Sequence, residues 1–263
     1  MTLPTLGFIG TGTLTTALVT GFCERAADKP YKIIVSPRNR DNSKMLQEKY
    51  PERVTVAESM QDVLDQAEWI MIAILPEAGE EVLKGLKFRK DHKVINFMSD
   101  KLLPDIRSWI GDTEVLVHMI PLTYNASFDG PIVLSPPNEE AAEIFGSIGE
   151  IVQLENRYHA ALFAAVTGCE APFFTLLNTI IDCCIREGVP ADAAFQYVAG
   201  FFKTTCDYAC TLDADGIRDK AAHSTPGGIN YMVKQGLAER GAFKAWDEAL
   251  QPAIERLAAN IPR

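Results

Sequence analysis

The sequence predicts an α/β protein in which an N-terminal Rossmann-type nucleotide-binding domain, residues 1–154, precedes a C-terminal all-helical domain, residues 155–263. Short β-rich runs alternate with helical patterns up to Leu154, as expected of βαβ units around a parallel sheet. Beyond that residue the strand patterns end and long helical patterns fill the chain. At 263 residues, the chain is long enough for two modest domains.

Seven runs are predicted to form a mostly parallel sheet that helices cover on both faces. These runs are residues 6–9, 32–36, 69–74, 93–97, 115–119, 132–134 and 151–154. Four helices are predicted in the later part, because apolar residues recur there at helical spacing. They are residues 157–187, 191–212, 229–237 and 242–259, with a Gly188-Val189-Pro190 break after the first.

The chain opens on a strand, a glycine turn and a helix. The apolar run 6–9 leads directly into Gly10-Thr11-Gly12, and apolar residues at helical spacing follow from Leu14. Such a turn presents free backbone N–H groups at a helix N-terminus, where the helix dipole stabilises a pyrophosphate. Gly10 permits the tight turn and Gly12 lets a ligand approach the backbone, so we predict a dinucleotide site here.

The residues after the second run indicate which dinucleotide is bound. A site that prefers NAD has an acidic residue there, which accepts a hydrogen bond from the ribose 2′-hydroxyl. This chain has Ser36 instead, followed by Arg38, Asn39 and Arg40. A hydroxyl, an amide and guanidinium groups favour a 2′-phosphate, and we therefore predict NADP(H) as the cofactor.

Composition narrows the class of partner. The net charge of −10 argues against nucleic acid or an anionic membrane surface, so neither is expected. Among the six cysteines only Cys206 and Cys210 share a helical face, without a nearby histidine, so no metal is expected. We interpret the cysteines as buried, reduced thiols, which are typical of a cytoplasmic protein.

Over essentially its whole length the sequence resembles the pyrroline-5-carboxylate reductase family, which reduces a cyclic imine to proline with NAD(P)H. The motifs that carry the likeness, in chain order, are residues 7–14, Val35-Ser36 with Arg38-Asn39, Ala73-Ile74-Leu75-Pro76, His118-Met119-Ile120-Pro121, Gly149-Glu150, Thr167-Gly168-Cys169 and Thr225-Pro226-Gly227-Gly228. The resemblance implies a full set of cofactor contacts. These are Gly10, Thr11, Gly12, Thr13, Leu14, Ser36, Arg38, Asn39, Leu75 and Pro76.

The turn at residues 225–228 is the motif that matches the family most specifically. Its proline fixes one backbone dihedral and its glycines accept positive φ, so successive N–H groups can form an anion nest before the helix at Ile229. The resemblance implies that Thr225, Gly227 and Gly228 bind the carboxylate of a small anionic substrate. It also implies that Asn230 stands where the family has a threonine that contacts the ring nitrogen, which makes Thr225 and Asn230 the candidate catalytic residues.

Five substitutions distinguish the chain from the family pattern. Leu75 replaces a lysine, Leu122 replaces an asparagine, and Ile229-Asn230 replaces a pair of threonines. Glu170 replaces a glycine, and it either holds a cationic substrate group or lies on the helix surface. The expected function is NADPH-dependent reduction of a small cyclic imine carboxylate in proline biosynthesis. The alternatives are reduction of a different imine or carbonyl on the same frame, and a non-catalytic NADP-binding protein.

The helical run 157–187 also predicts an assembly. It is apolar around most of its circumference, so it must be covered on several sides. We therefore expect a homodimer or a higher homo-oligomer. The resemblance implies the same, since the family's helical domains interlock in a dimer and complete each other's substrate pockets.

Overall fold

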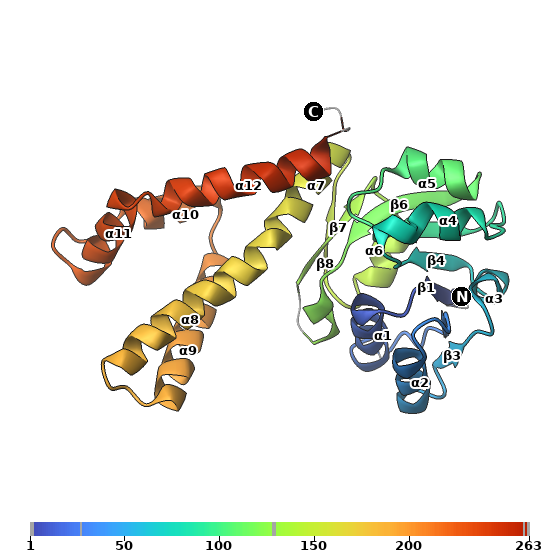
Figure 1. Ribbon diagram of the computed structural model, residues 1–263, viewed down its shortest axis with the longest axis horizontal. Coiled ribbons are helices and arrows are strands. Elements are labelled where there is room, and N and C mark those ends of the chain that lie inside the picture. The colour runs from blue at the N-terminus through green and yellow to red at the C-terminus, as the bar shows by residue number, and fades with distance from the viewer. Residues whose placement is uncertain (1–2, 27, 128–129, 260, 262–263) are drawn as a thin grey trace. The chain divides into compact units, whose positions relative to one another are not determined.

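The computed structural model describes residues 3–26, 28–127, 130–259 and 261 (Figure 1). Contacts divide the chain into two compact units, one formed by Met1–Ala164 with Arg256–Arg263 and the other by Ala165–Glu255. The functional boundary predicted between residues 154 and 155 stays a prediction.

The first unit is built on an eight-stranded sheet in the order β3-β2-β1-β4-β5-β6-β7-β8. The strands are β1 (Leu6–Ile9), β2 (Ile33–Val35), β3 (Val54–Val56), β4 (Trp69–Ile72), β5 (Lys93–Asn96), β6 (Val115–Ile120), β7 (Pro131–Ser135) and β8 (Glu150–Gln153). All neighbouring strands are parallel except β6 and β7. The predicted fold class, a Rossmann-type sheet followed by helices, is confirmed.

Two features of the sheet differ from the sequence prediction. Strand β3 is absent from the prediction because it is three residues long, lies at the sheet edge and exposes Thr55. Strand β7 is antiparallel to β6. The prediction of a mostly parallel sheet did not specify the direction of this strand. A parallel return needs a crossover of a dozen or more residues. The connection over residues 121–130 is shorter and holds the short 3₁₀ helix η2 (Thr123–Ala126).

Helices cover both faces of this sheet, and the period-two alternation of the strands divides the core accordingly. In β1, Leu6 and Phe8 face one apolar cluster while Ile9 faces the other. The first cluster is completed by α1 (Thr13–Glu24), α2 (Arg40–Lys49) and α6 (Glu139–Phe145). The second is completed by α3 (Met60–Gln66), α4 (Gly79–Lys84) and α5 (Leu103–Ile110).

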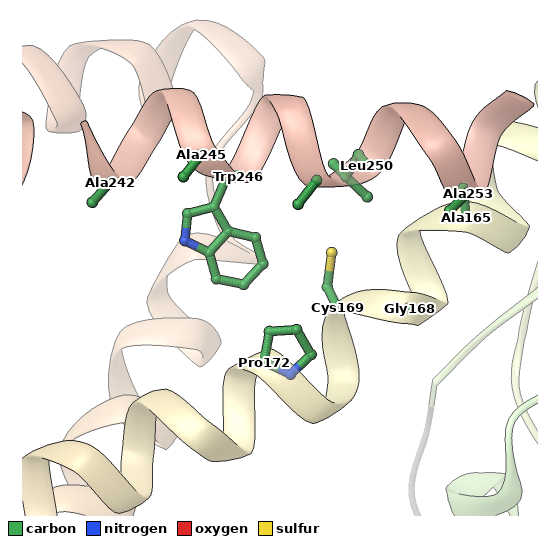
Figure 2. Close-up of a pocket in the computed structure, with 10 residues that line it drawn as sticks. Ala165, Gly168, Cys169, Pro172, Ala242, Ala245, Trp246, Leu250 and Ala253 are labelled. Atoms are coloured by element: carbon green, nitrogen blue, oxygen red, sulfur yellow. The ribbon is translucent and has the colours of Figure 1, made fainter.

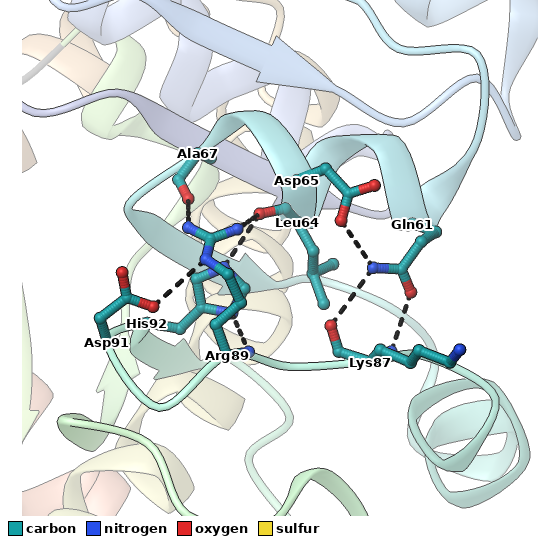
Figure 3. A network of polar contacts seen from close by, with 8 residues as sticks. All are labelled: Gln61, Leu64, Asp65, Ala67, Lys87, Arg89, Asp91 and His92. Carbon is teal, nitrogen blue, oxygen red and sulfur yellow. Dashed lines mark hydrogen bonds and ion pairs between the residues drawn. The ribbon is translucent and has the colours of Figure 1, made fainter.

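A polar network holds the segment before β5 on the C-terminal end of α3 (Figure 3). The Arg89 guanidinium donates to the carbonyls of Leu64 and Ala67, which the end of the helix leaves without partners. The Nδ1 atom of His92 accepts from the Arg89 N–H at 3.0 Å, so Nε2 carries the proton and donates to the Leu64 carbonyl at 2.9 Å. Burial lowers the pKa of His92, which keeps this imidazole neutral near pH 7.

The second unit is entirely helical. It contains η3 (Thr167–Cys169), α8 (Glu170–Arg186), α9 (Ala191–Ala209), α10 (Ala214–Ala222), α11 (Ile229–Glu239) and most of α12 (Ala242–Ala258). The helix predicted over 157–187 is therefore α7 (Arg157–Val166) and α8 joined by one 3₁₀ turn. Helices α8 and α9 pack against each other (Figure 1). Over residues 165–255, all of which are described, only Ala165, Ala194 and Val198 are buried.

The stretch from Arg157 to Arg186 is long and apolar enough to cross a membrane, judged by length and composition alone. A core helix of a soluble protein passes the same test, so this property by itself is weak support for a membrane span. The expectation that the protein has no membrane partner stays a prediction.

Candidate active site

A groove of about 810 Å³ lies where several strands of the sheet end. Segments that follow the carboxyl ends of β1, β2, β4 and β5 meet there, which is where ligands bind in open α/β sheets. The lining residues are Gly10, Thr11, Gly12, Thr13, Leu14, Arg38, Asn39, Arg40, Ala73, Ile74, Leu75, Ala78 and Phe97.

The glycine turn at the start of α1 has the backbone that an anion site requires. Gly10 has a φ of +98°, and a Cβ atom there would lie 2.3 Å from the Ala73 carbonyl oxygen, so only glycine fits. Gly12 is the N-cap of α1, has open space where a Cβ would be, and leaves the helix without a side-chain cap. The first N–H groups of α1 are thus available to a phosphate in the groove.

Ser36, a predicted phosphate ligand, lies behind the glycine turn and does not line the groove. It is fully buried, and its hydroxyl accepts a hydrogen bond from the Gly10 N–H at 2.9 Å. Its carbonyl accepts from the Thr11 hydroxyl at 2.7 Å. Thr15, where a small residue is usual, donates its hydroxyl to the Gly10 carbonyl at 2.7 Å. In this structure Ser36 and Thr15 fix the shape of the turn.

Positive charge lines the groove beside the end of β2. Arg38 and Arg40 are exposed, and neither forms an ion pair with a residue that the structure describes. None of the lining residues is acidic, so the carboxylate typical of an NAD ribose site is missing from the groove. Asn39 also lines the groove and caps α2 by accepting from the Asn42 N–H at 3.5 Å.

Five residues that line the groove were missing from the predicted contact set: Arg40, Ala73, Ile74, Ala78 and Phe97. Arg40 is among the guanidinium groups predicted to favour a 2′-phosphate, but it was not assigned as a contact. Asn42 links α2 to the glycine turn by donating its amide to the Thr11 carbonyl at 3.0 Å. Its place three residues after the N-cap Asn39 was the only signal for it. Of the other predicted contacts, Leu75 lines the groove and is 75% exposed, whereas Pro76 lies just outside it at the start of η1 (Pro76–Ala78).

The turn at residues 225–228 has the geometry expected of an anion nest. Gly227 has a φ of +76°, and the Gly228 N–H donates to the Thr225 carbonyl at 2.9 Å. Gly228 is the N-cap of α11 and no side chain caps this helix, so its first N–H groups are available to an anion. Asn230 lies in the first turn of α11 and is exposed.

Glu170 stands apart from this turn. It is exposed in the first turn of α8, and no hydrogen bond or ion pair between described residues joins it to residues 225–230. A contact between Glu170 and a substrate held at the turn stays a prediction.

The cysteines are less buried than their sequence context suggested. All six thiols are free, and Cys183, Cys206 and Cys210 are exposed while the other three are partly buried. The interpretation of buried thiols is therefore wrong for these three exposed cysteines, which belong to a helical unit that buries few of its own side chains, whereas Cys23 packs against the core of the first unit. In the described part of the chain, no group of three or more His, Cys, Asp or Glu residues is arranged to hold a metal.

Comparisons with known proteins cover both units of the chain. A family model described as NADP oxidoreductase, coenzyme F420-dependent, matches residues 5–100, which include every residue lining the groove. The pyrroline-5-carboxylate reductase of Pisum sativum is 25% identical over 249 residues, covering 91% of this chain and 89% of the relative. That of Pseudomonas aeruginosa is 19% identical over 268 residues, covering 98% and 97%.

Solved structures share the fold over the whole chain. The 1-pyrroline-5-carboxylate reductase of Streptococcus pyogenes superposes with a TM-score of 0.84 at 18% identity, covering 97% of this chain and 98% of that one. Plasmodium falciparum pyrroline carboxylate reductase, solved with NADP bound, gives 0.82 at 19% identity and covers 98% of each chain. Relatives of one name therefore match the nucleotide unit and the helical unit together, and the chain is similar to pyrroline-5-carboxylate reductases over nearly its whole length.

Proposed function

We propose that the protein is an NADPH-dependent reductase that acts on the C=N bond of a small cyclic imine carboxylate, pyrroline-5-carboxylate or a close relative of it. The groove at the glycine turn is the main support, because it joins an uncapped helix N-terminus to two guanidinium groups that have no ion-pair partner among the described residues, and none of its described lining residues is acidic. The substrate class is supported by relatives of that name along nearly the whole chain. Such a reaction belongs to proline biosynthesis.

The residues of the groove fit NADP(H). The N–H groups of Thr13 and Leu14 would hold the pyrophosphate at the positive end of the α1 dipole. Arg38 and Arg40 would pair with the 2′-phosphate, since a planar guanidinium can donate two parallel hydrogen bonds to it. When bound, NADPH supplies the hydride that reduces the imine carbon.

The turn before α11 is a second candidate binding site, which lies in the helical unit. The free N–H groups that follow Gly227 would accept the substrate carboxylate, and the α11 dipole favours that negative charge. Asn230 has both donor and acceptor atoms one step further along the helix, so its amide can orient a ring nitrogen. These residues bind and position the substrate.

The reaction needs little acid–base apparatus. A protonated C=N is already electrophilic, so the protein contributes mainly by orienting the two reactants and excluding water. His118 is no candidate proton donor in this structure, because its side chain is fully buried in β6 and Asn96 contacts its Nδ1 atom at 3.3 Å. One titratable pair lies directly before the substrate turn, where His223 Nδ1 is 2.9 Å from Asp219 Oδ1 and both side chains are exposed.

A second candidate function is reduction of another imine or carbonyl. Ile229 is 80% exposed beside the anion nest, where it presents an apolar surface to any bound substrate. Leu75 presents another from the cofactor groove. Both replace polar family residues, so they favour a less polar substrate than pyrroline-5-carboxylate. The third possibility, a non-catalytic NADP-binding protein, has no specific observation in its favour.

We also propose that the chain works as a homodimer whose helical units cover each other. The helical unit buries almost none of its own side chains, and Phe195, Tyr197 and Met232 are each at least 62% exposed. Apolar helices with no core of their own need a partner surface. A chemically identical partner would bring the same uncovered helices, which suits an interface of the obligate kind.

One hollow in the helical unit is suited to such a partner helix (Figure 2). It has a volume of about 410 Å³ and lies between the start of α8 and α12, with the Cys169 thiol and the Trp246 indole pointing into it. Most of its other lining residues are alanines, which permit close approach of a helix. Ala249→Arg should therefore produce a monomer by sedimentation, whereas Gln251→Arg, which does not line the hollow, should leave the dimer intact. A wild-type monomer at micromolar concentration contradicts this proposal.

The catalytic proposal is tested by following the loss of NADPH absorbance with the purified chain. Pyrroline-5-carboxylate, its six-membered homologue and an acyclic 2-oxo acid are compared at equal concentrations. The proposal expects turnover with a cyclic imine carboxylate and none with the oxo acid. Turnover of the oxo acid alone would support the second candidate function, and NADPH binding without any turnover would support the non-catalytic one.

We place the protein in the cytoplasm, on the grounds that its six cysteines are all free thiols.

A further inference from the structure

The glycine turn at the cofactor groove is held in part by a side chain from another helix. The carbonyls of Gly10 and Gly12 accept hydrogen bonds from residues of α1, the helix that the turn begins. The Thr11 carbonyl between them accepts from the Asn42 amide of α2 at 3.0 Å. No other donor of the described chain reaches this carbonyl, so its direction depends on Asn42.

The Asn42 amide thereby also sets the direction of one backbone donor. The peptide bond between Thr11 and Gly12 is trans and planar, so the Thr11 carbonyl and the Gly12 N–H point in opposite directions. Gly12 lines the groove, and its N–H donates to no acceptor among the described residues. With its carbonyl tied to α2, this peptide unit presents the N–H on the side away from Asn42.

This peptide unit has little else to hold it. The Thr11 side chain is anchored, because it is 2% exposed and its hydroxyl donates to the Ser36 carbonyl at 2.7 Å. Gly12 has no side chain, and a Cβ placed there would have no atom within 4 Å. A glycine without packing contacts has many accessible backbone conformations, and fixing one of them costs conformational entropy. The hydrogen bond from Asn42 selects one conformation before any ligand arrives.

Asn42 acts on the groove without lining it. Its side chain is partly exposed, so the core does not require it, and it is not among the residues that form the groove wall. Its own backbone N–H is capped by the Asn39 side chain at 3.5 Å, which places Asn42 in the first turn of α2. The Asn42 amide therefore reaches a bound ligand only through the Thr11 carbonyl.

We propose that Asn42 is a positioning residue for the pyrophosphate of the dinucleotide, because it holds the Thr11–Gly12 peptide so that the Gly12 N–H is preorganised as a donor. This inference rests on the proposed function, which identifies the bound molecule as NADP(H). NADPH and NADH share the pyrophosphate, so Asn42 strengthens the binding of both to the same extent. Arg38, in contrast, would strengthen only the binding of NADPH.

The test is a titration of the purified full chain with NADPH, NADH and adenosine 2′-phosphate, which carries the 2′-phosphate but no pyrophosphate. Asn42→Ala should weaken both dinucleotides by about threefold to tenfold, as expected for the loss of one hydrogen bond. The NADPH/NADH affinity ratio and the affinity for adenosine 2′-phosphate should not change. Asn42→Leu, which keeps the side-chain volume without the donor, should give the same loss as Asn42→Ala. Gln47→Ala removes an exposed amide further along α2 and should change none of these affinities.

Three outcomes would overturn the inference. They are wild-type affinity for the dinucleotides in Asn42→Ala or Asn42→Leu, a loss confined to NADPH, and an equal loss for adenosine 2′-phosphate. The last would mean that Asn42 supports the segment around Arg38 and not the glycine turn. If the wild-type chain binds neither dinucleotide, the proposed function fails and this inference fails with it. If the wild-type chain binds both and Asn42→Ala binds them equally well, only this inference fails.

Discussion

Replacing Arg38 by alanine should remove most of the preference for NADPH over NADH. The guanidinium lies at the edge of the groove, is exposed and has no ion-pair partner among the described residues, so a 2′-phosphate would be its first partner. NADH lacks that phosphate and would make no equivalent contact. Arg38→Ala should therefore leave the affinity for NADH nearly unchanged.

The size of the effect follows from the number of charged contacts. One charge-assisted contact contributes about 1.5–3 kcal/mol, which corresponds to about a tenfold to hundredfold difference in affinity. Arg40 also lines the groove and would retain part of the attraction. We expect Arg38→Ala to reduce the NADPH/NADH affinity ratio by about tenfold, and Arg38→Ala with Arg40→Ala to reduce it to near unity.

Fluorescence titration of the two cofactors measures this ratio directly. Lys44→Ala is a matched control, since Lys44 is an exposed cation on α2 that does not line the groove. Salt should weaken NADPH binding more than NADH binding, because a partly exposed charge pair is screened. Equal wild-type affinities for the two cofactors, or a preference that survives the double substitution, would refute the reasoning.

Three further predictions concern single side chains. Ser36→Ala removes the buried acceptor of the Gly10 N–H, so urea unfolding should show a loss of about 1–3 kcal/mol while the NADPH/NADH ratio stays constant; a changed ratio would return Ser36 to the phosphate site. Asn230→Ala should lower kcat about tenfold or more with little change in NADPH affinity, and Asn230→Thr should raise any turnover of pyrroline-5-carboxylate; a kcat equal to wild type in Asn230→Ala would contradict its role. Burial lowers the pKa of both His92 and His118, so below about pH 6.5 the unfolded chain binds protons that the native state does not. The free energy of unfolding should be full above that pH and fall on acidification by up to about 1.4 kcal/mol per pH unit for each histidine, and a flat profile down to about pH 5 would exclude this coupling.

Much of the nucleotide unit could be predicted from the sequence because its signals are local. Alternation of apolar residues marked seven of the eight strands, and only the three-residue β3 was missed. The glycine turn could also be predicted from the sequence. Only glycine can adopt a φ of +98° so close to the Ala73 carbonyl, so the residue type itself indicates the turn. A backbone conformation that only one residue type can adopt is therefore predictable from the sequence.

The direction in which a side chain points could not be predicted from the sequence in this way. The sequence placed Ser36 next to the groove, but it gave no indication that the hydroxyl turns inward to the Gly10 N–H. The proximity of His118 and Ser135 is even less predictable, because the antiparallel pairing of β6 and β7 brings them together. That pairing depends on the length of a connection, and the helical periodicity used to find α7 carries no information about it.

The cofactor groove and the substrate turn differ in which residues can be substituted without losing the fold. In the cofactor groove the backbone makes the essential contacts, and Gly10 cannot be replaced without a clash at 2.3 Å. At the substrate turn the backbone feature, Gly227 at a φ of +76°, is likewise present. The neighbouring side chains Ile229 and Asn230 are exposed, so no core packing restricts their identity. Substitution at such positions alters what the turn recognises while leaving the anion nest in place. Substitutions at these positions can therefore change the shape of the substrate that a reductase of this fold accepts. They do so with the least loss of stability, because the cofactor groove and the carboxylate anchor stay unchanged.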